Sequence, residues 1–188
     1  MEKHSHCHRA GSPGFTLVEL MVVLVILSVL GTVGGPAFVG MVRSSQLTNA
    51  SNAFLSSLWL TRSEALRRGA RTAMCRSADG AHCAGAGGWE QGWIVFLDRD
   101  GDGAPDAPES ILLRQQALDN GVLIRGNRPV ADTIWFGPSG RSRKVSGALQ
   151  AGTVTLCHRS AEPGKARQIV VSAPGRPRLQ GVEVDLCG

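Results

Sequence analysis

The chain has few of the residues from which enzyme sites are most often built. It contains five histidines, and three of them, His4, His6 and His8, precede residue 10, so that the remaining sequence holds only His82 and His158. It has no Gly-x-Ser-x-Gly motif and no cysteine and histidine at a spacing typical of a catalytic pair. We therefore expect neither an enzymatic activity nor a cofactor.

Lysine is also scarce, because Lys3, Lys144 and Lys165 are the only lysines among 20 basic residues. Arginine supplies the rest, and its planar guanidinium suits bidentate contacts with carboxylate or phosphate. The charge is unevenly distributed: residues 89–120 hold seven acidic and two basic residues (net −5), and residues 139–188 hold eight basic and three acidic residues (net +5). The sequence thus predicts a domain with an acidic part and a basic part.

Charged residues are absent from the 23-residue apolar segment 20–42. At a rise of 1.5 Å per residue a helix of this length reaches roughly 34 Å, enough to cross a hydrocarbon core of about 30 Å. Glu19 lies immediately before the apolar segment. A carboxylate at the edge of a membrane span costs several kcal/mol unless it is paired, so we regard Glu19 as a functional residue.

The polar residues before this segment do not form an ordinary secretory signal, because the apolar stretch follows a glycine instead of ending at a small-residue cleavage site. Residues 14–20, GFTLVEL, resemble the processing site of type IV prepilins and type II secretion pseudopilins. The resemblance implies that a prepilin peptidase cuts after Gly14 and methylates the new amino terminus at Phe15. It also implies that Glu19 pairs with the terminal ammonium of a neighbouring subunit, since a buried carboxylate and a buried ammonium are tolerable together.

This resemblance divides the chain into three segments. Residues 1–14 are expected to be a leader, residues 15–42 the transmembrane and assembly half of a long helix, and residues 43–188 a periplasmic helix end with a β-rich domain. The partners it implies are other pilin subunits, the bacterial inner membrane and the peptidase. The protein is then a single-pass inner-membrane protein that is incorporated into a pilus or pseudopilus.

The sequence after residue 43 changes from a helical to a strand-like pattern. Apolar residues recur at helical spacing up to Gly69, which favours an amphipathic helix packed on a domain. Short strand-like segments separated by turn residues follow. We predict strands at residues 71–76, 92–97, 111–115, 122–125, 133–136, 153–158, 168–172 and, with a weaker pattern, 182–186. The expected fold is α+β, with one long N-terminal helix and an antiparallel sheet in one or two layers.

Three segments in this region, 61–69, 89–98 and 136–141, with a cysteine at position 75, resemble the GspH/FimT type of minor pilins and pseudopilins. The resemblance covers nearly the whole chain and implies the type IV pilin-like fold. Its two functional implications differ: a minor pilin of a type IV pilus, or a structural pseudopilin of a type II secretion system. Trp89, Trp93 and Phe96 are expected to be core aromatics.

Cysteine usage fits an exported domain. Cys7 lies in the predicted leader, and four cysteines remain: Cys75, Cys83, Cys157 and Cys187. An even number favours two disulfides, and of the three possible pairings the spacing suggests Cys75–Cys83 and Cys157–Cys187. A zinc site is the alternative, which the absence of a C-x-x-C pair disfavours.

The acidic part contains a complete match to the calcium-loop pattern, with Asp98, Asp100, Asp102 and Glu109 as ligands. Its context differs from that of known calcium loops, because strand-like sequence precedes it and Pro105 and Pro108 interrupt the half that would enter a helix. We therefore interpret it as a solvated hairpin loop and expect no response to calcium. A calcium-stabilised adhesive tip subunit is the alternative.

The basic part contains Gly175-Arg176-Pro177-Arg178 after a predicted strand, and alternation in an extended segment directs the two arginines to one side. Such a pair suits phosphate. The element resembles a C-terminal basic motif of DNA-binding FimT minor pilins, which implies sequence-independent binding of double-stranded DNA during natural transformation. The other basic residues assigned to this interface are Arg141, Arg143, Lys144, Lys165 and Arg167. The alternative is a solvated turn whose arginines pair with surface carboxylates.

Overall fold

The structure is a computed structural model that describes residues 14–118, 121–159 and 164–187, apart from a few side chains within them. The predicted leader up to residue 13 lies outside these ranges. By its contacts the chain forms two units, Met1–Val42 and Arg43–Gly188.

One helix, α1 (Leu17–Arg68, 52 residues), passes through both units. At its start the Glu19 backbone N–H donates to Thr16 Oγ1 at 3.2 Å, so that Thr16 acts as the N-cap of a Thr-x-x-Glu capping motif. The helix ends before Gly69, whose φ of +60° is readily adopted only by glycine. The processing motif therefore also has a local structural role at the helix start.

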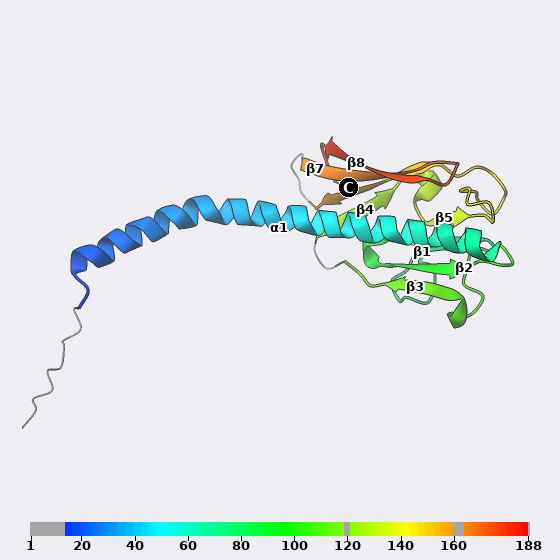
Figure 1. Ribbon diagram of the computed structural model, residues 1–188, viewed down its shortest axis with the longest axis horizontal. Coiled ribbons are helices and arrows are strands. Elements are labelled where there is room, and N and C mark those ends of the chain that lie inside the picture. The colour runs from blue at the N-terminus through cyan, green and yellow to red at the C-terminus, as the bar shows by residue number, and fades with distance from the viewer. Residues whose placement is uncertain (1–13, 119–120, 160–163, 188) are drawn as a thin grey trace, which may run out of the picture. The chain divides into compact units, whose positions relative to one another are not determined.

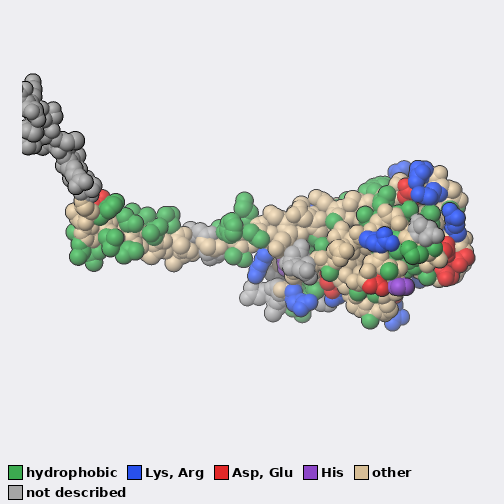
Figure 2. Space-filling view, turned by 90° about the horizontal axis from the view of Figure 1, so that it is seen from below, with side chains coloured by type: hydrophobic (Ala, Val, Ile, Leu, Met, Phe, Trp, Pro, Cys, Tyr) green, Lys and Arg blue, Asp and Glu red, His purple; other side chains and the backbone are tan. Residues whose placement is uncertain are grey.

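The first unit consists of the apolar half of this helix. α1 is long and apolar enough to cross a membrane, judged by length and composition. Its described large apolar side chains before Arg43 are exposed, and Figure 2 shows patches of hydrophobic side chains along this segment. Such a surface is stable only when lipid or other apolar helices cover it.

The second unit combines the end of α1 with two antiparallel four-stranded sheets (Figure 1). The first sheet has the order β3-β2-β1-β5 and the second the order β4-β6-β7-β8. The strands are β1 (Thr72–Arg76), β2 (Trp93–Leu97), β3 (Ile111–Gln115), β4 (Val122–Gly126), β5 (Thr133–Phe136), β6 (Gly152–His158), β7 (Gly164–Val171) and β8 (Pro177–Val184). Short 3-10 helices occur at η1 (Trp89–Gln91), η2 (Pro108–Ser110) and η3 (Arg128–Val130).

The main core lies where α1 packs against both sheets. The predicted helical face is buried, with Phe54 and Leu58 fully inaccessible. The Phe54 ring contacts the edges of Trp89 and Trp93, with centroids 5.2 Å apart in both cases. Each aromatic contact of this kind adds about 0.5–1.5 kcal/mol beyond the burial of area. Trp89, Trp93 and Phe96 are all fully buried, which confirms that they are core residues.

A smaller cluster covers the other face of the first sheet. Ala73, Ile94 and Phe96 form it with the half-cystine Cys75. Both predicted disulfides are confirmed: Cys75–Cys83 and Cys157–Cys187, with Cα atoms 5.6 and 5.8 Å apart.

The predicted α+β fold is confirmed, and the two-layer alternative for the sheet is the one observed. The boundaries of the last two strands differ from the prediction. β7 begins at Gly164 instead of residue 168, and β8 begins at Pro177 instead of residue 182. The two strands pair over eight residues, with Gly164 opposite Val184 at one end and Val171 opposite Pro177 at the other. Each strand is therefore longer than its most apolar part. Local apolar patterning does not reveal such pairing, because the hydrogen bonds come from the neighbouring strand.

Candidate nucleic-acid interface

The Gly-Arg-Pro-Arg element forms the turn into β8. Gly175 and Pro177 are buried, whereas Arg176 and Arg178 are exposed. Within the turn, the Gly175 N–H donates to Ser172 O at 2.7 Å and Ser172 Oγ donates to Arg176 O at 3.0 Å. These two hydrogen bonds hold the backbone of the turn, and the side chains of Arg176 and Arg178, on either side of Pro177, are exposed to solvent.

A second loop, Gly137–Arg141, packs directly against this turn. Gly175 has φ +80°, and a Cβ built on it would lie 1.9 Å from Gly140 O. The Ser142 N–H donates to Ala173 O at 3.1 Å, which joins the two segments by a backbone hydrogen bond. The exposed Arg141 is therefore carried by a loop in contact with the turn that carries Arg176.

Arg62 connects the end of α1 to the same contact. Its Nε donates to Gly140 O at 3.1 Å, and its guanidinium carbon lies 5.7 Å from the centroid of the Trp59 ring. Local sequence patterning could not reveal this partner, because Gly140 is 78 residues away from Arg62.

Arg143 and Lys144 extend the interface along the next hairpin. Both side chains are exposed, Arg143 pairs with Leu149 in a β-bridge, and its Nη1 donates to Gly147 O at 2.9 Å. These two residues follow Arg141 directly, so they belong to the same loop region.

Lys165 and Arg167 do not join this group. Arg178 pairs with Val170 across the sheet, whereas Lys165 and Arg167 occupy the alternate positions that face α1. Arg167 Nη2 donates to Thr48 Oγ1 of the helix at 2.9 Å. The two side chains line a groove of about 610 Å³ beside α1. Arg167 pairs with Gly181, three residues along β8 from Arg178, or about 10 Å at 3.3 Å per residue. Five of the seven basic residues assigned to the interface therefore lie on the loop group, which comprises residues 137–144 and the turn 172–178. The other two, Lys165 and Arg167, lie on the face of β7 that is turned towards α1.

The five basic residues Arg141, Arg143, Lys144, Arg176 and Arg178 take part in none of the ion pairs found among the described residues. Other arginines of the domain behave differently. Arg67 and Arg68 bind Glu64, and these hydrogen bonds lower the pKa of the Glu64 carboxyl. Within the described ranges, the alternative in which Arg176 and Arg178 pair with surface carboxylates is therefore not observed.

The other predicted sites lie elsewhere. Gly14, Phe15 and Glu19 are exposed at the start of α1. The acidic loop follows β2, with Asp100 and Asp102 exposed. Asp98 is fully buried, so the interpretation of a wholly solvated loop is wrong for this residue. The Glu109 side chain lies outside the described residues.

Comparisons with known proteins agree with this architecture. Residues 50–175 match the family model described as type II transport protein GspH, and residues 9–34 match the prokaryotic N-terminal methylation motif. The chain belongs to the GspH family and carries the pilin processing motif. It is accordingly a pilin-like protein of the minor pilin and pseudopilin class.

Crystal structures of a type IV minor pilin show the same fold at low sequence identity. The type IV minor pilin FimU of Pseudomonas aeruginosa PAO1 superimposes with a TM-score of 0.55 and 17% identity, covering 73% of this chain and 90% of FimU. A second crystal form of FimU superimposes with a TM-score of 0.54 and 18% identity, covering 71% of this chain and 92% of FimU. For the minor pseudopilin EpsH of Vibrio cholerae the TM-score is 0.49 and the identity 14%, covering 72% of this chain and 96% of EpsH. No curated protein sequence matches the chain.

Proposed function

We propose that the protein is a minor pilin of a type IV pilus that binds double-stranded DNA without sequence preference, as a step in DNA uptake for natural transformation. The observation that carries this proposal is the pair Arg176 and Arg178, exposed on a turn whose intervening Pro177 is buried and without carboxylate partners among the described residues. The domain anchored by α1 faces the periplasm or the pilus surface, where DNA is accessible.

The chemistry of these side chains suits a phosphate backbone. Each guanidinium can donate two parallel hydrogen bonds to phosphate oxygens, and each neutralised phosphate releases condensed counterions. The turn is already held by backbone hydrogen bonds and by Pro177, so little conformational entropy is lost when it meets a ligand. Contacts of this kind position DNA but do not read its sequence.

The test uses the unit 43–188, which has its own core and both disulfides. Binding to a fluorescent duplex is measured by anisotropy from 50 to 200 mM salt, on the order of the range over which such contacts weaken strongly. Replacing Arg176 and Arg178 with Gln should weaken binding to any duplex and reduce the salt slope by about 2. Lys at both positions should retain only part of the affinity, because it lacks the bidentate geometry.

A matched control replaces Arg128 and Arg159 with Gln. Both arginines are exposed and lie outside the loop group, and replacing them removes the same net charge as replacing Arg176 and Arg178. This variant should bind nearly as the parent does. If the variant at positions 176 and 178 binds like this control at every salt concentration, the DNA proposal fails and a structural pseudopilin of a type II secretion system becomes the better assignment. The matching family model is described as a type II transport protein, which is why the pseudopilin is kept as the second candidate.

The same proposal includes assembly. Cleavage after Gly14 leaves Phe15 as the amino terminus, and Glu19 has no ion-pair partner among the described residues, so it is available to a neighbouring subunit. The apolar half of α1 would be held in the inner membrane before assembly and covered by other subunits afterwards.

A further inference from the structure

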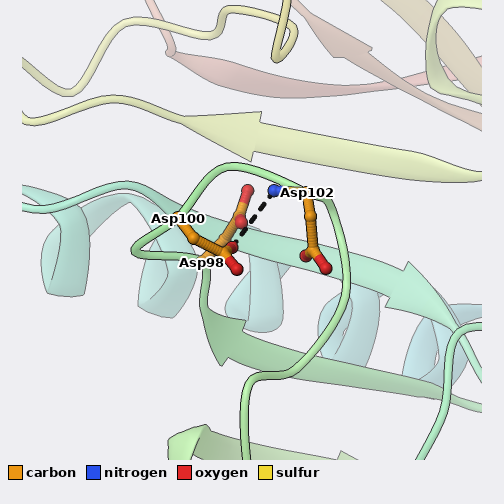
Figure 3. Close-up of side chains that lie close together, drawn as sticks. All are labelled: Asp98, Asp100 and Asp102. Atoms are coloured by element: carbon orange, nitrogen blue, oxygen red, sulfur yellow. Dashed lines mark hydrogen bonds between the residues drawn. The ribbon is translucent and has the colours of Figure 1, made fainter.

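We propose that Asp98, Asp100 and Asp102 form a binding site for a divalent cation, with calcium preferred over magnesium. This site is separate from the basic loops and does not depend on the proposed DNA binding. The three carboxylates come from one loop, and Figure 3 shows them within the same turn of the chain.

Asp98 carries a buried carboxylate. The side chain is fully inaccessible, Oδ1 accepts a hydrogen bond from the Gly103 N–H at 3.3 Å, and Oδ2 has no partner within the described part of the chain. A buried carboxylate oxygen without a donor is costly and rare. A cation would provide the missing partner of Oδ2.

The three carboxylates lie close enough together to share one ion. One oxygen from each of the three carboxylates lies within 4.8 Å of the others. Two ligands on one calcium ion, at 2.3–2.6 Å each, can be at most about 5 Å apart, whereas two on magnesium can be at most about 4.2 Å apart. One ion can therefore bridge these oxygens, and the flexible coordination of calcium, with six to eight oxygen ligands, suits an exposed loop better than the strict octahedral geometry of magnesium.

The exposed carboxylates leave room for the remaining ligands. Asp100 Oδ1 accepts from the Asp102 N–H and Asp102 Oδ1 from the Ala104 N–H, so each has a second oxygen without a protein donor among the described residues. Both side chains are exposed, and water can complete the six to eight oxygen ligands that calcium takes. Arg71 is a competing cation beside the loop, since its Nη1 would lie 2.6 Å from a Cβ built on Gly101.

The experiment uses the full chain in detergent with its disulfides intact, and it records thermal unfolding in calcium chloride or magnesium chloride. With a dissociation constant on the order of 0.1–1 mM, calcium at ten times this value should raise Tm by about 4 °C, and magnesium should raise it less. No shift with calcium, or an equal shift with magnesium, would overturn the proposal.

Charge variants locate the effect. Replacing the exposed Asp100 and Asp102 with Asn should abolish the calcium response, whereas Asp106→Asn, in the same loop but outside the cluster, should preserve it. Asp98→Asn should also abolish the response, with no loss of Tm in calcium-free buffer. An equal calcium response in the double variant and in Asp106→Asn contradicts the site.

A luminescent probe gives an independent location. A Cβ on Gly103 would lie 3.6 Å from Trp135, so terbium bound in place of calcium should be sensitised by this indole. Trp135→Phe should reduce the terbium signal while the calcium-induced Tm shift persists. The Gln variant at positions 176 and 178 should keep both responses, so a failure of DNA binding leaves this proposal unaffected.

Discussion

Replacing Gly175 with alanine tests whether the two basic loops act as one unit. The residue has φ +80°, a conformation that costs an alanine about 1–2 kcal/mol. Its new Cβ would also lie 1.9 Å from Gly140 O, a backbone atom that cannot rotate away. Forcing the loops apart adds about 1–3 kcal/mol, typical of overpacking. The total loss in the free energy of unfolding is therefore about 2–5 kcal/mol.

Gly147→Ala is the matched control. Gly147 has φ +82°, but nothing lies within 4 Å of the position of its Cβ. This variant should lose only the conformational part, about 1–2 kcal/mol. At about 3 °C per kcal/mol for a domain of this size, Gly175→Ala should melt about 3–9 °C below Gly147→Ala.

DNA affinity provides the second readout. Gly175→Ala changes no charge, yet it should weaken DNA binding because it separates the loop of Arg141 from the turn of Arg176. Gly147→Ala should bind as the parent does. Equal melting temperatures and equal affinities for the two variants would refute the idea that the loop contact organises the interface.

Two further predictions concern the ion pair between Glu90 of η1 and Arg125 of β4, and the start of α1. Burial acts to raise the pKa of Glu90, but hydrogen bonds from Arg125 and the Ile124 N–H outweigh it and leave the pKa below its ordinary value of 4.5. The pair thus stabilises the fold above about pH 4.5, and this contribution is lost as the pH falls through the lowered pKa. Glu90→Gln should cost about 1–3 kcal/mol at pH 7, and urea unfolding should show the gap to the parent closing towards pH 3; a pH-independent gap would contradict the ion-pair argument. Gly14→Val should block leader cleavage, whereas Glu19→Ala should be cleaved but incorporated poorly into filaments, as judged by immunoblots of sheared fractions. Normal incorporation of Glu19→Ala would contradict the proposed pairing with a neighbouring terminus.

Much of the fold could be predicted because the signals are local. Helical spacing of Phe54 and Leu58 and the stop at Gly69 define the second half of α1, and turn residues separate most strands. The last two strands were placed less well, because the pairing of β7 with β8 depends on a neighbour and not on the segment's own apolar pattern.

The sequence by itself determined the apolar helix that is long enough to cross a membrane, the methylation motif around Gly14 and Glu19, the set of charged residues and the favoured cysteine pairing. These are properties of composition and short spacing, which do not require knowledge of distant contacts. Only the tertiary structure decided which charges act together. Sheet register turns Arg167 towards α1 and leaves Arg178 facing away from it, and contact between loops brings Gly175 against Gly140. Burial, which depends on the whole fold, separates Asp98 from its exposed neighbours and leaves its Oδ2 without a partner among the residues that the structure describes.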